Sequence, residues 1–303
     1  MTPRRPDSRP APAPGLVVVD KPGGMTSHDV VGRLRRYFGT RKVGHAGTLD
    51  PMATGVLVVG IERATKMLGL LALETKSYEA TIRLGQTTTT DDAEGETTAS
   101  SDASAVTDEA IGAAVAGLTG TLEQVPSSVS AIKVDGRRAY DRVRAGEEVE
   151  LRARQVTVSR FDVVERRSVG TAVDLVVVVD CSTGTYIRAL ARDLGGELGV
   201  GGHLTALRRT SVGPFGLDVA RTLPELEAGP RLSLDLDRAA LTAFPVREID
   251  AGQAEGLRHG RWLDARGDTG VVAALGPDGK VAALLSESGD RASPVVVMRP
   301  AGL

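Results

Sequence analysis

The chain has 303 residues, of which 41% are hydrophobic and 25% charged, and its formal net charge is −2. This length and composition can bury a substantial core and exclude a globally disordered protein. A single cysteine, Cys181, excludes an internal disulfide framework, and the scattered histidines argue against a zinc site. No apolar run approaches a membrane span and no signal-peptide stretch precedes Pro14, so we expect a cytoplasmic protein without membrane attachment.

The charged residues are unevenly distributed along the chain. Every charged residue between Val30 and Leu49 is basic, and every charged residue between Gly85 and Val125 is acidic. Each run alone is typical of a solvated surface, although the basic run also fits a local phosphate-facing patch on a nearly neutral protein. Because residues 85–105 are also rich in Thr and Ser, we expect them to form a mobile loop.

The N-terminal half of the chain predicts alternating strands and helices. Residues 1–14 form a Pro/Arg/Ala-rich tail that we expect to be disordered. An apolar strand at 16–20 precedes a glycine-rich turn, and Thr26 with Asp29 marks the capped start of a helix over 27–38. Further elements follow in chain order: a strand at 56–60, a helix over 64–73, a half-buried strand at 78–84 and a helix over 107–118.

The second half continues this mixture and then changes character. We expect a strand at 129–134, a DG turn, a helix near 138–145, a strand pair over 156–165 and 172–180, and an amphipathic helix over 187–198. Strands and helices interleave without a regular βα period, which predicts an α+β fold with a mixed sheet. Short apolar strands at 271–275, 281–285 and 295–298 predict a small all-β C-terminal domain. The predicted domains are therefore 15–240 and 245–303, after the tail.

Several familiar catalytic motifs are absent, and one loop stands out. The chain lacks GxxxxGK[ST], GxSxG and HExxH, and the SxxK match at 130–133 lacks its SDN and KTG companions. The glycine-punctuated loop over 44–55 carries Asp50 next to an apolar run, and rigid loops often hold functional groups. An Asp-Pro pair is most often a plain turn, so spacing alone does not decide the role of Asp50.

The segment GHAGTLDPMATGVLVV at 44–59 resembles the catalytic motif of the TruB family, the bacterial tRNA pseudouridine-55 synthases. Four more stretches agree in the same order: LVVVDKPGGMTSHDVV, KSYEATIRLG, PSSVSAIKVDGRRAYDRVRAG and CSTGTYIRALARDLGGELGVGGHLTALRR. The sequence departs from the family pattern at GGH, where GAH is usual, and at VRAG, where many members have AREG. The resemblance implies a pseudouridine synthase fold, with a largely antiparallel mixed sheet flanked by helices and a PUA-like C-terminal domain.

The resemblance also implies a reaction and a substrate. A uridine in the T loop of tRNA is flipped out, its N1–C1′ bond is broken, and the uracil rotates and rejoins through C5, without a cofactor or a metal. Asp50 matches the catalytic aspartate, and an ionised carboxylate can act as a nucleophile at C1′ or a base at C2′. The implied partner is the tRNA T stem-loop, and we expect a monomer with no obligate protein partner.

The remaining site residues follow from the same motifs. Arg188 matches the arginine that pairs with the aspartate, and a guanidinium can hold a carboxylate through two parallel contacts. Tyr78 matches the tyrosine that stacks on the target base and takes or relays the C5 proton. Tyr186, His45 and Leu207 match other substrate-contacting positions. Without the resemblance, each of these residues would be expected in an ordinary structural role.

Two alternatives to this enzyme use the same surface. One is a tRNA-binding or folding chaperone without essential catalysis, and the other is an RNA-guided relative that works in a larger ribonucleoprotein. The intact set of Asp50, Tyr78 and Arg188 favours the enzyme, and the lack of long Lys-rich tails favours a protein that acts alone. The C-terminal segment has nearly balanced charge, which does not indicate phosphate binding.

Overall fold

The structure is a computed structural model that describes residues 10–127, 133–134, 137–138 and 151–302. Within these ranges, the largest sheet has ten strands. In chain order they are β1 (Gly15–Lys21), β2 (Val43–Ala46), β3 (Thr54–Ile61), β4 (Lys76–Leu84), β7 (Gly120–Gln124), β10 (Arg154–Val169), β11 (Ala172–Cys181), β12 (Gly202–Val212), β13 (Phe215–Gly216) and β14 (Leu234–Asp235).

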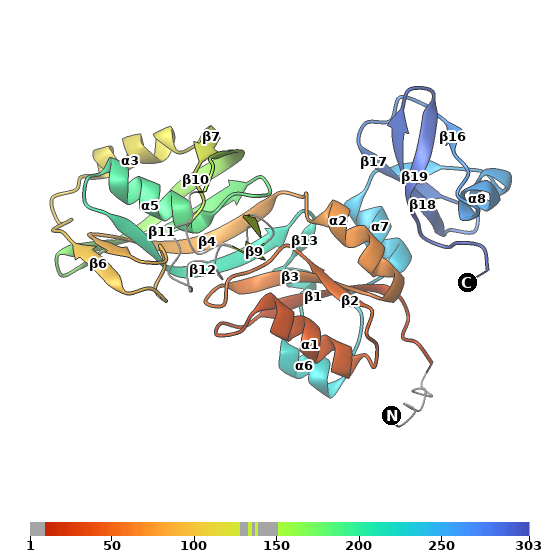
Figure 1. The fold of residues 1–303 in the computed structure, drawn as a ribbon, viewed down its shortest axis with the longest axis horizontal. Coiled ribbons are helices and arrows are strands. Elements are labelled where there is room, and N and C mark those ends of the chain that lie inside the picture. Colours follow the sequence, from red (N-terminus) through yellow and green to blue (C-terminus); the bar gives the residue numbers. More distant parts are fainter. Residues whose placement is uncertain (1–9, 128–132, 135–136, 139–150, 303) are drawn as a thin grey trace.

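The strand order of this sheet is β14-β1-β3-β12-β4-β11-β10-β7, with β2 paired to β3 and β13 paired to β12 (Figure 1). Its described strand pairs are antiparallel apart from β3 with β12, which confirms the predicted mixed, largely antiparallel sheet. The helical elements are α1 (Ser27–Tyr37), the 3₁₀ helix η1 (Glu62–Met67), α2 (Leu68–Leu71), α3 (Asp108–Gly117), α5 (Ile187–Glu197), the 3₁₀ helix η2 (Leu217–Val219), α6 (Leu223–Ala228), α7 (Leu236–Ala243) and α8 (Ala251–Arg258).

Apolar side chains cover both faces of strands β1 and β3. In β1, Val17 and Val19 pack into the cluster that contains α1, α3, α5 and α6. Leu16 and Val18 point the other way, into the cluster that contains α2 and α7. A strand that is buried on both faces needs a continuous apolar run rather than an alternating one, which explains the LVVV sequence of β1 and the similar run in β3.

The C-terminal part has a sheet of its own. Its strand order is β15-β17-β18-β19-β16. Apolar residues of this sheet share a cluster with α7, so the two parts of the chain are packed together. Arg299 and Asp237 of α7 add an ion pair across this junction at 2.6 Å. The bounds of these strands are β15 (Val246–Glu248), β16 (Leu263–Asp264), β17 (Val271–Leu275), β18 (Val281–Ser288) and β19 (Arg291–Val297).

Most predicted elements are confirmed, including the capping box of Thr26 and Asp29 at the start of α1. The helix expected over 64–73 begins two residues earlier and ends two residues earlier, and most of it is the 3₁₀ helix η1 rather than an α-helix. The expectation that residues 85–105 form a loop was wrong, because β5 (Gln86–Thr88) and β6 (Thr97–Ser100) pair in a hairpin; the mobility of this segment stays a prediction. The C-terminal part is not all-β, because it contains α8.

Several predictions lie largely outside the described residues: the structure describes only residues 10–14 of the tail expected at 1–14, and only residues 133–134 of the strand expected at 129–134. The helix expected near 138–145 cannot be compared with the structure beyond its first residue, which is a strand residue. On either side of the predicted DG turn, β8 (Lys133–Val134) pairs with β9 (Arg137–Arg138). Among the described residues, no helix has the length and apolar character needed to cross a bilayer.

Candidate active site

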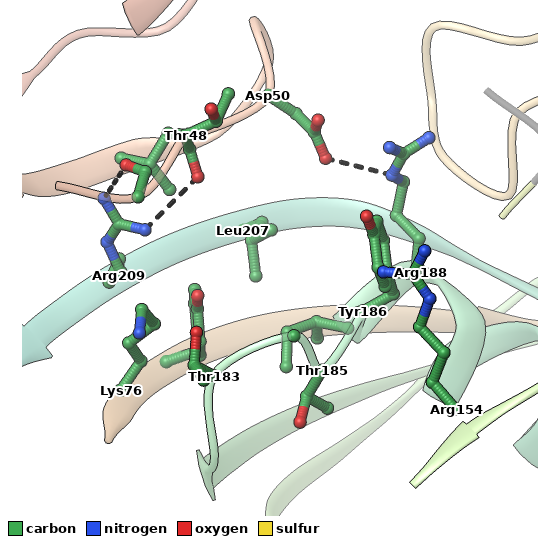
Figure 2. A pocket seen from close by; sticks show the side chains of 15 residues that line it. Thr48, Asp50, Lys76, Arg154, Thr183, Thr185, Tyr186, Arg188, Leu207 and Arg209 are labelled. Carbon is green, nitrogen blue, oxygen red and sulfur yellow. Dashed lines mark hydrogen bonds and ion pairs between the residues drawn. The ribbon is translucent and has the colours of Figure 1, made fainter. Parts of the chain in front are cut away.

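A pocket of ≈ 400 Å³ lies between the loop after β2 and the turn before α5 (Figure 2). Its size lies within the range typical of small-molecule sites. Strands β4 and β12 contribute the central part of its lining, where Tyr78 and Arg209 stand directly opposite each other in the sheet. The lining residues are Gly47, Thr48, Leu49, Asp50, Lys76, Tyr78, Arg154, Thr183, Gly184, Thr185, Tyr186, Ile187, Arg188, Leu207 and Arg209.

The pocket brings together most of the predicted site residues. Asp50, Tyr78, Tyr186, Arg188 and Leu207 all line it, although they come from distant parts of the chain. His45, the remaining predicted site residue, lies on β2 opposite Val59 of β3. It is not part of the pocket lining. Its predicted substrate contact therefore stays a prediction.

Arg188 joins two carboxylates at one edge of the pocket. Its Nε lies 3.0 Å from Oδ2 of Asp50, and its Nη1 lies 3.4 Å from Oδ2 of Asp92 (Figure 2 shows the first contact). The Asp50 side chain is 36% exposed, whereas those of Arg188 and Asp92 are 5% and 3% exposed. The buried guanidinium is thus anchored on a buried carboxylate and presents the other carboxylate to the pocket.

This geometry differs from the expected two-contact pair of Arg188 with Asp50. The guanidinium is shared, because Nη1 also donates to the carbonyl oxygen of Thr90 at 3.0 Å and lies near Asp92. The Asp92 carboxylate is itself fixed, since its Oδ1 accepts from the Thr90 hydroxyl and from the backbone N–H of Glu94. Taking two charges out of water is costly, and additional hydrogen bonds help to offset that cost. The contacts of Asp92 Oδ1 and of Arg188 Nη1 provide such bonds.

The loop that carries Asp50 is held from several sides. Ser27 Oγ accepts from the backbone N–H of Leu49 at 2.9 Å and donates to its carbonyl oxygen at 3.2 Å. The buried ammonium of Lys21 donates to the carbonyl oxygen of Pro51 at 3.2 Å, and burial lowers the pKa of Lys21 to about 8. These contacts flank Asp50 and orient its side chain without touching the carboxylate.

Arg209 holds the start of the same loop. Its guanidinium donates to the carbonyl oxygens of Gly47 and Thr48, at 3.1 and 3.3 Å, and to that of Val56 at 2.7 Å. The hydrogen bond to Val56 requires the backbone of β3 to approach Arg209 closely. A Cβ at Gly55 would lie only 2.1 Å from the Arg209 carbonyl oxygen. Glycine at position 55, with a φ of +98°, permits this approach.

Tyr78 is a buried residue of β4 whose side chain lines the pocket. Burial raises the pKa of Tyr78, while the neighbouring Arg209 guanidinium acts in the opposite direction. The phenol therefore stays neutral at physiological pH and offers an aromatic ring together with one hydroxyl. This form suits stacking on a base and passing on a proton more than it suits a permanent phenolate base.

Several residues of this site were not predicted from the sequence. Asp92 was hidden in an acidic run that indicated a solvated surface, and no local signal marks its burial beside Arg188. Lys76, Arg154 and Arg209 also line the pocket, and their positions depend on strand pairing. In the part of the chain that the structure describes, no group of three or more His, Cys, Asp or Glu residues is arranged to hold a metal ion.

Comparison with solved structures identifies the class of fold. The chain is similar to the structure described as "Crystal structure of the archaeal box H/ACA sRNP Nop10-Cbf5 complex", with a TM-score of 0.70, 25% identity and coverage of 95% of this chain and 87% of that chain. A second structure, "Crystal Structure of a Cbf5-Nop10-Gar1 Complex", has a TM-score of 0.70, 27% identity and coverage of 94% and 85%. The fold is a pseudouridine synthase fold with a PUA-like C-terminal part.

Sequence comparison gives the family. The model described as "TruB family pseudouridylate synthase (N terminal domain)" matches residues 35–187, and two TruB C-terminal models match 188–241 and 244–299. The chain belongs to the TruB family and is an isomerase. Among its relatives, "tRNA pseudouridine synthase B" of Nocardia farcinica is 66% identical over 98% of this chain and 97% of its own length. The protein of the same name from Rhodococcus jostii is 67% identical over 95% of both chains.

Proposed function

We propose that this chain converts uridine to pseudouridine at position 55 in the T loop of tRNA, with Asp50 as the catalytic carboxylate. The observation that carries the proposal is the ion pair of Asp50 with Arg188 at a pocket lined by Tyr78 and Leu207. The names of the relatives support tRNA as the substrate. Resemblance of the loop around Asp50 to the family's catalytic motif supports the position in the T loop.

In the proposed reaction, a flipped uridine enters the pocket beside Asp50. The N1–C1′ bond breaks, the free uracil turns, a C5–C1′ bond forms, C5 loses a proton and N1 gains one. Nothing is oxidised or hydrolysed overall, so the step needs positioned charge and a proton path rather than a further reactant. Asp50 acts either as a nucleophile at C1′ or as a base at C2′.

The other pocket residues have distinct roles in this proposal. Arg188 holds Asp50 in place from a buried position, and a flipped base stacks on the ring of Tyr78. Leu207 is an apolar wall against which the uracil can turn, because it offers no hydrogen bond that favours one orientation. Tyr186 completes the wall next to Arg188.

The direct experiment uses an unmodified tRNA transcript. Purified protein is incubated with this RNA, and pseudouridine is mapped by chemical probing. We expect one modified position, in the T loop. Modification elsewhere, or none, would contradict the proposed substrate site. We also propose that the chain acts as a monomer in the cytoplasm. Sedimentation of the purified protein measures its oligomeric state and so tests the first part of this proposal.

Replacing Tyr78 with Phe keeps the aromatic ring and removes the hydroxyl. We expect tRNA affinity to stay within about twofold, while the single-turnover rate falls roughly 10²-fold because proton transfer from C5 loses its relay. The measurement is release of tritium from C5-labelled uridine, compared with tRNA binding. A variant with wild-type kinetics would remove the hydroxyl from the proton path.

The basic patch around α1 predicts a salt-dependent contribution to affinity. Arg36 and Arg41 are exposed, and within the described part of the chain neither side chain has a hydrogen-bond or ion-pair partner. If both contact phosphates, neutralising them to Gln lowers the slope of log affinity against log salt by roughly 1.5, since each contact contributes roughly 0.7 to 0.9. An unchanged slope would show that the patch is only a solvated surface.

A further inference from the structure

Two side chains at the start of helix α5 line the pocket. Tyr186 is the residue immediately before the helix, and Arg188 is the second residue within it. The helix has no side-chain cap of its own, because Tyr186 occupies the capping position and offers no suitable acceptor. The direction in which Arg188 leaves the backbone therefore depends on what fixes the chain just before the helix.

A glutamine from another strand supplies that fixation. The Gln124 side chain, at the end of β7, donates from Nε2 to the carbonyl oxygen of Tyr186 at 3.1 Å. Its Oε1 accepts from the backbone N–H of the same Tyr186 at 2.8 Å. The residue is only 3% exposed, so water does not compete for either bond. One side-chain amide thus bonds both backbone groups of Tyr186, whose carbonyl oxygen also accepts from the Leu190 N–H at 3.1 Å.

The position of Gln124 beside the pocket follows from strand pairing. Gln124 stands opposite Arg154 in the antiparallel pair of β7 and β10, and residues opposite each other point to the same face of a sheet. Arg154 lines the pocket (Figure 2). The core face at this end of the two strands therefore reaches the pocket, and the buried amide lies behind the wall that Tyr186 forms.

The opposite wall is held in the same way. Ser27 contacts both backbone groups of Leu49, the residue before Asp50, from the first turn of α1. Asp50 comes one residue after Leu49, and Arg188 comes two residues after Tyr186. In both cases one buried side chain from another element fixes the backbone of the earlier residue. We therefore expect a change at either fixed residue to alter the 3.0 Å contact of the pair.

We propose that Gln124 is a positioning residue for pseudouridine formation, because it fixes the backbone at Tyr186 and through it the placement of Arg188 against Asp50. The proposal rests on the proposed function for its effect on turnover. The expected effect of Gln124 on the backbone at Tyr186 is independent of that function. Glutamine is specific here: a carboxylate in its place can accept from the N–H but cannot donate to the carbonyl, and an alkyl group can do neither.

The test compares Gln124→Leu, Gln124→Glu and a matched control, Ser233→Ala. Ser233 Oγ accepts from the backbone N–H of Val18, so the control also removes a long-range bond between a side chain and the backbone, away from the pocket lining. We expect kcat to fall roughly 10- to 100-fold in Gln124→Leu, with KM and tRNA affinity nearly unchanged, because a small misplacement affects the reacting geometry more than binding. Gln124→Glu is expected to be intermediate, and Ser233→Ala to keep the wild-type kcat.

Amide hydrogen exchange gives a second measurement that needs no activity. Exchange over residues 182–189 is expected to accelerate in Gln124→Leu and to stay at the wild-type rate in Ser233→Ala. Unchanged exchange in Gln124→Leu, or a wild-type kcat in that variant below its unfolding temperature, would overturn the proposal. If the wild-type protein makes no pseudouridine, the proposed function fails, while the exchange experiment still decides whether Gln124 fixes this backbone.

Discussion

Asp50→Asn is expected to abolish pseudouridine formation, with a loss on the order of 10⁴-fold or more, while tRNA still binds with nearly wild-type affinity. The amide has almost the same shape as the carboxylate but cannot attack C1′ or remove a proton at C2′. Because the Asp50 side chain is partly exposed and most of its loop is held by Ser27, Lys21 and Arg209, we expect little change in stability. The measurements are single-turnover pseudouridine formation and equilibrium tRNA binding.

A matched control for this variant is Asp162→Asn. Asp162 also pairs with an arginine, Arg160, at 2.6 Å, but the pair is exposed and both residues lie outside the pocket lining. This change should leave turnover unaltered. Turnover retained in Asp50→Asn would remove Asp50 from catalysis, whereas loss of binding together with turnover would favour a role in holding the RNA. The Asp50→Asn comparison also separates the enzyme from a tRNA chaperone, because a chaperone would keep its activity without the carboxylate.

Local patterns in the sequence were sufficient to predict many of the elements. The apolar runs of β1 and β3, the capping box at Thr26 and the helical spacing of apolar residues through α5 all depend on neighbouring residues. The parallel pairing of β3 with β12 has no such signal, because it joins residues that are far apart in the chain. The 85–105 segment was misjudged for a related reason: its hairpin depends on distant contacts, such as that of the Leu204 N–H with the Asp91 carbonyl oxygen.

The candidate site shows the same division between local and long-range information. Asp50, Tyr78 and Arg188 were named from motifs, and the fold places them around one pocket. Charge patterning assigned Asp92 to the solvated surface, because acidic residues are rarely buried unless they are paired. Its partner, Arg188, comes from a different element, so the burial of Asp92 could be seen only once the two were brought together.

Arg188→Met is expected to reduce turnover roughly 10²-fold or more and also to destabilise the protein. The loss of turnover follows because Asp50 loses the cation that places it in the pocket. The loss of stability follows because Asp92, with a side chain only 3% exposed, is left without its buried cation. Breaking a buried pair by removing one partner costs about 3–5 kcal/mol, which thermal or denaturant unfolding measures directly.

The double variant Arg188→Met with Asp92→Asn separates these two effects. An amide at position 92 can still accept from the Thr90 hydroxyl and the Glu94 N–H through one oxygen, but it carries no charge to compensate. We expect much of the lost stability to return while turnover stays low, since Asp50 still lacks its partner. If turnover returned together with stability, Arg188 would serve only to fold the site. If neither returned, the coupling between Arg188 and Asp92 would be too weak to account for the destabilisation, and the cause would lie in the packing around α5.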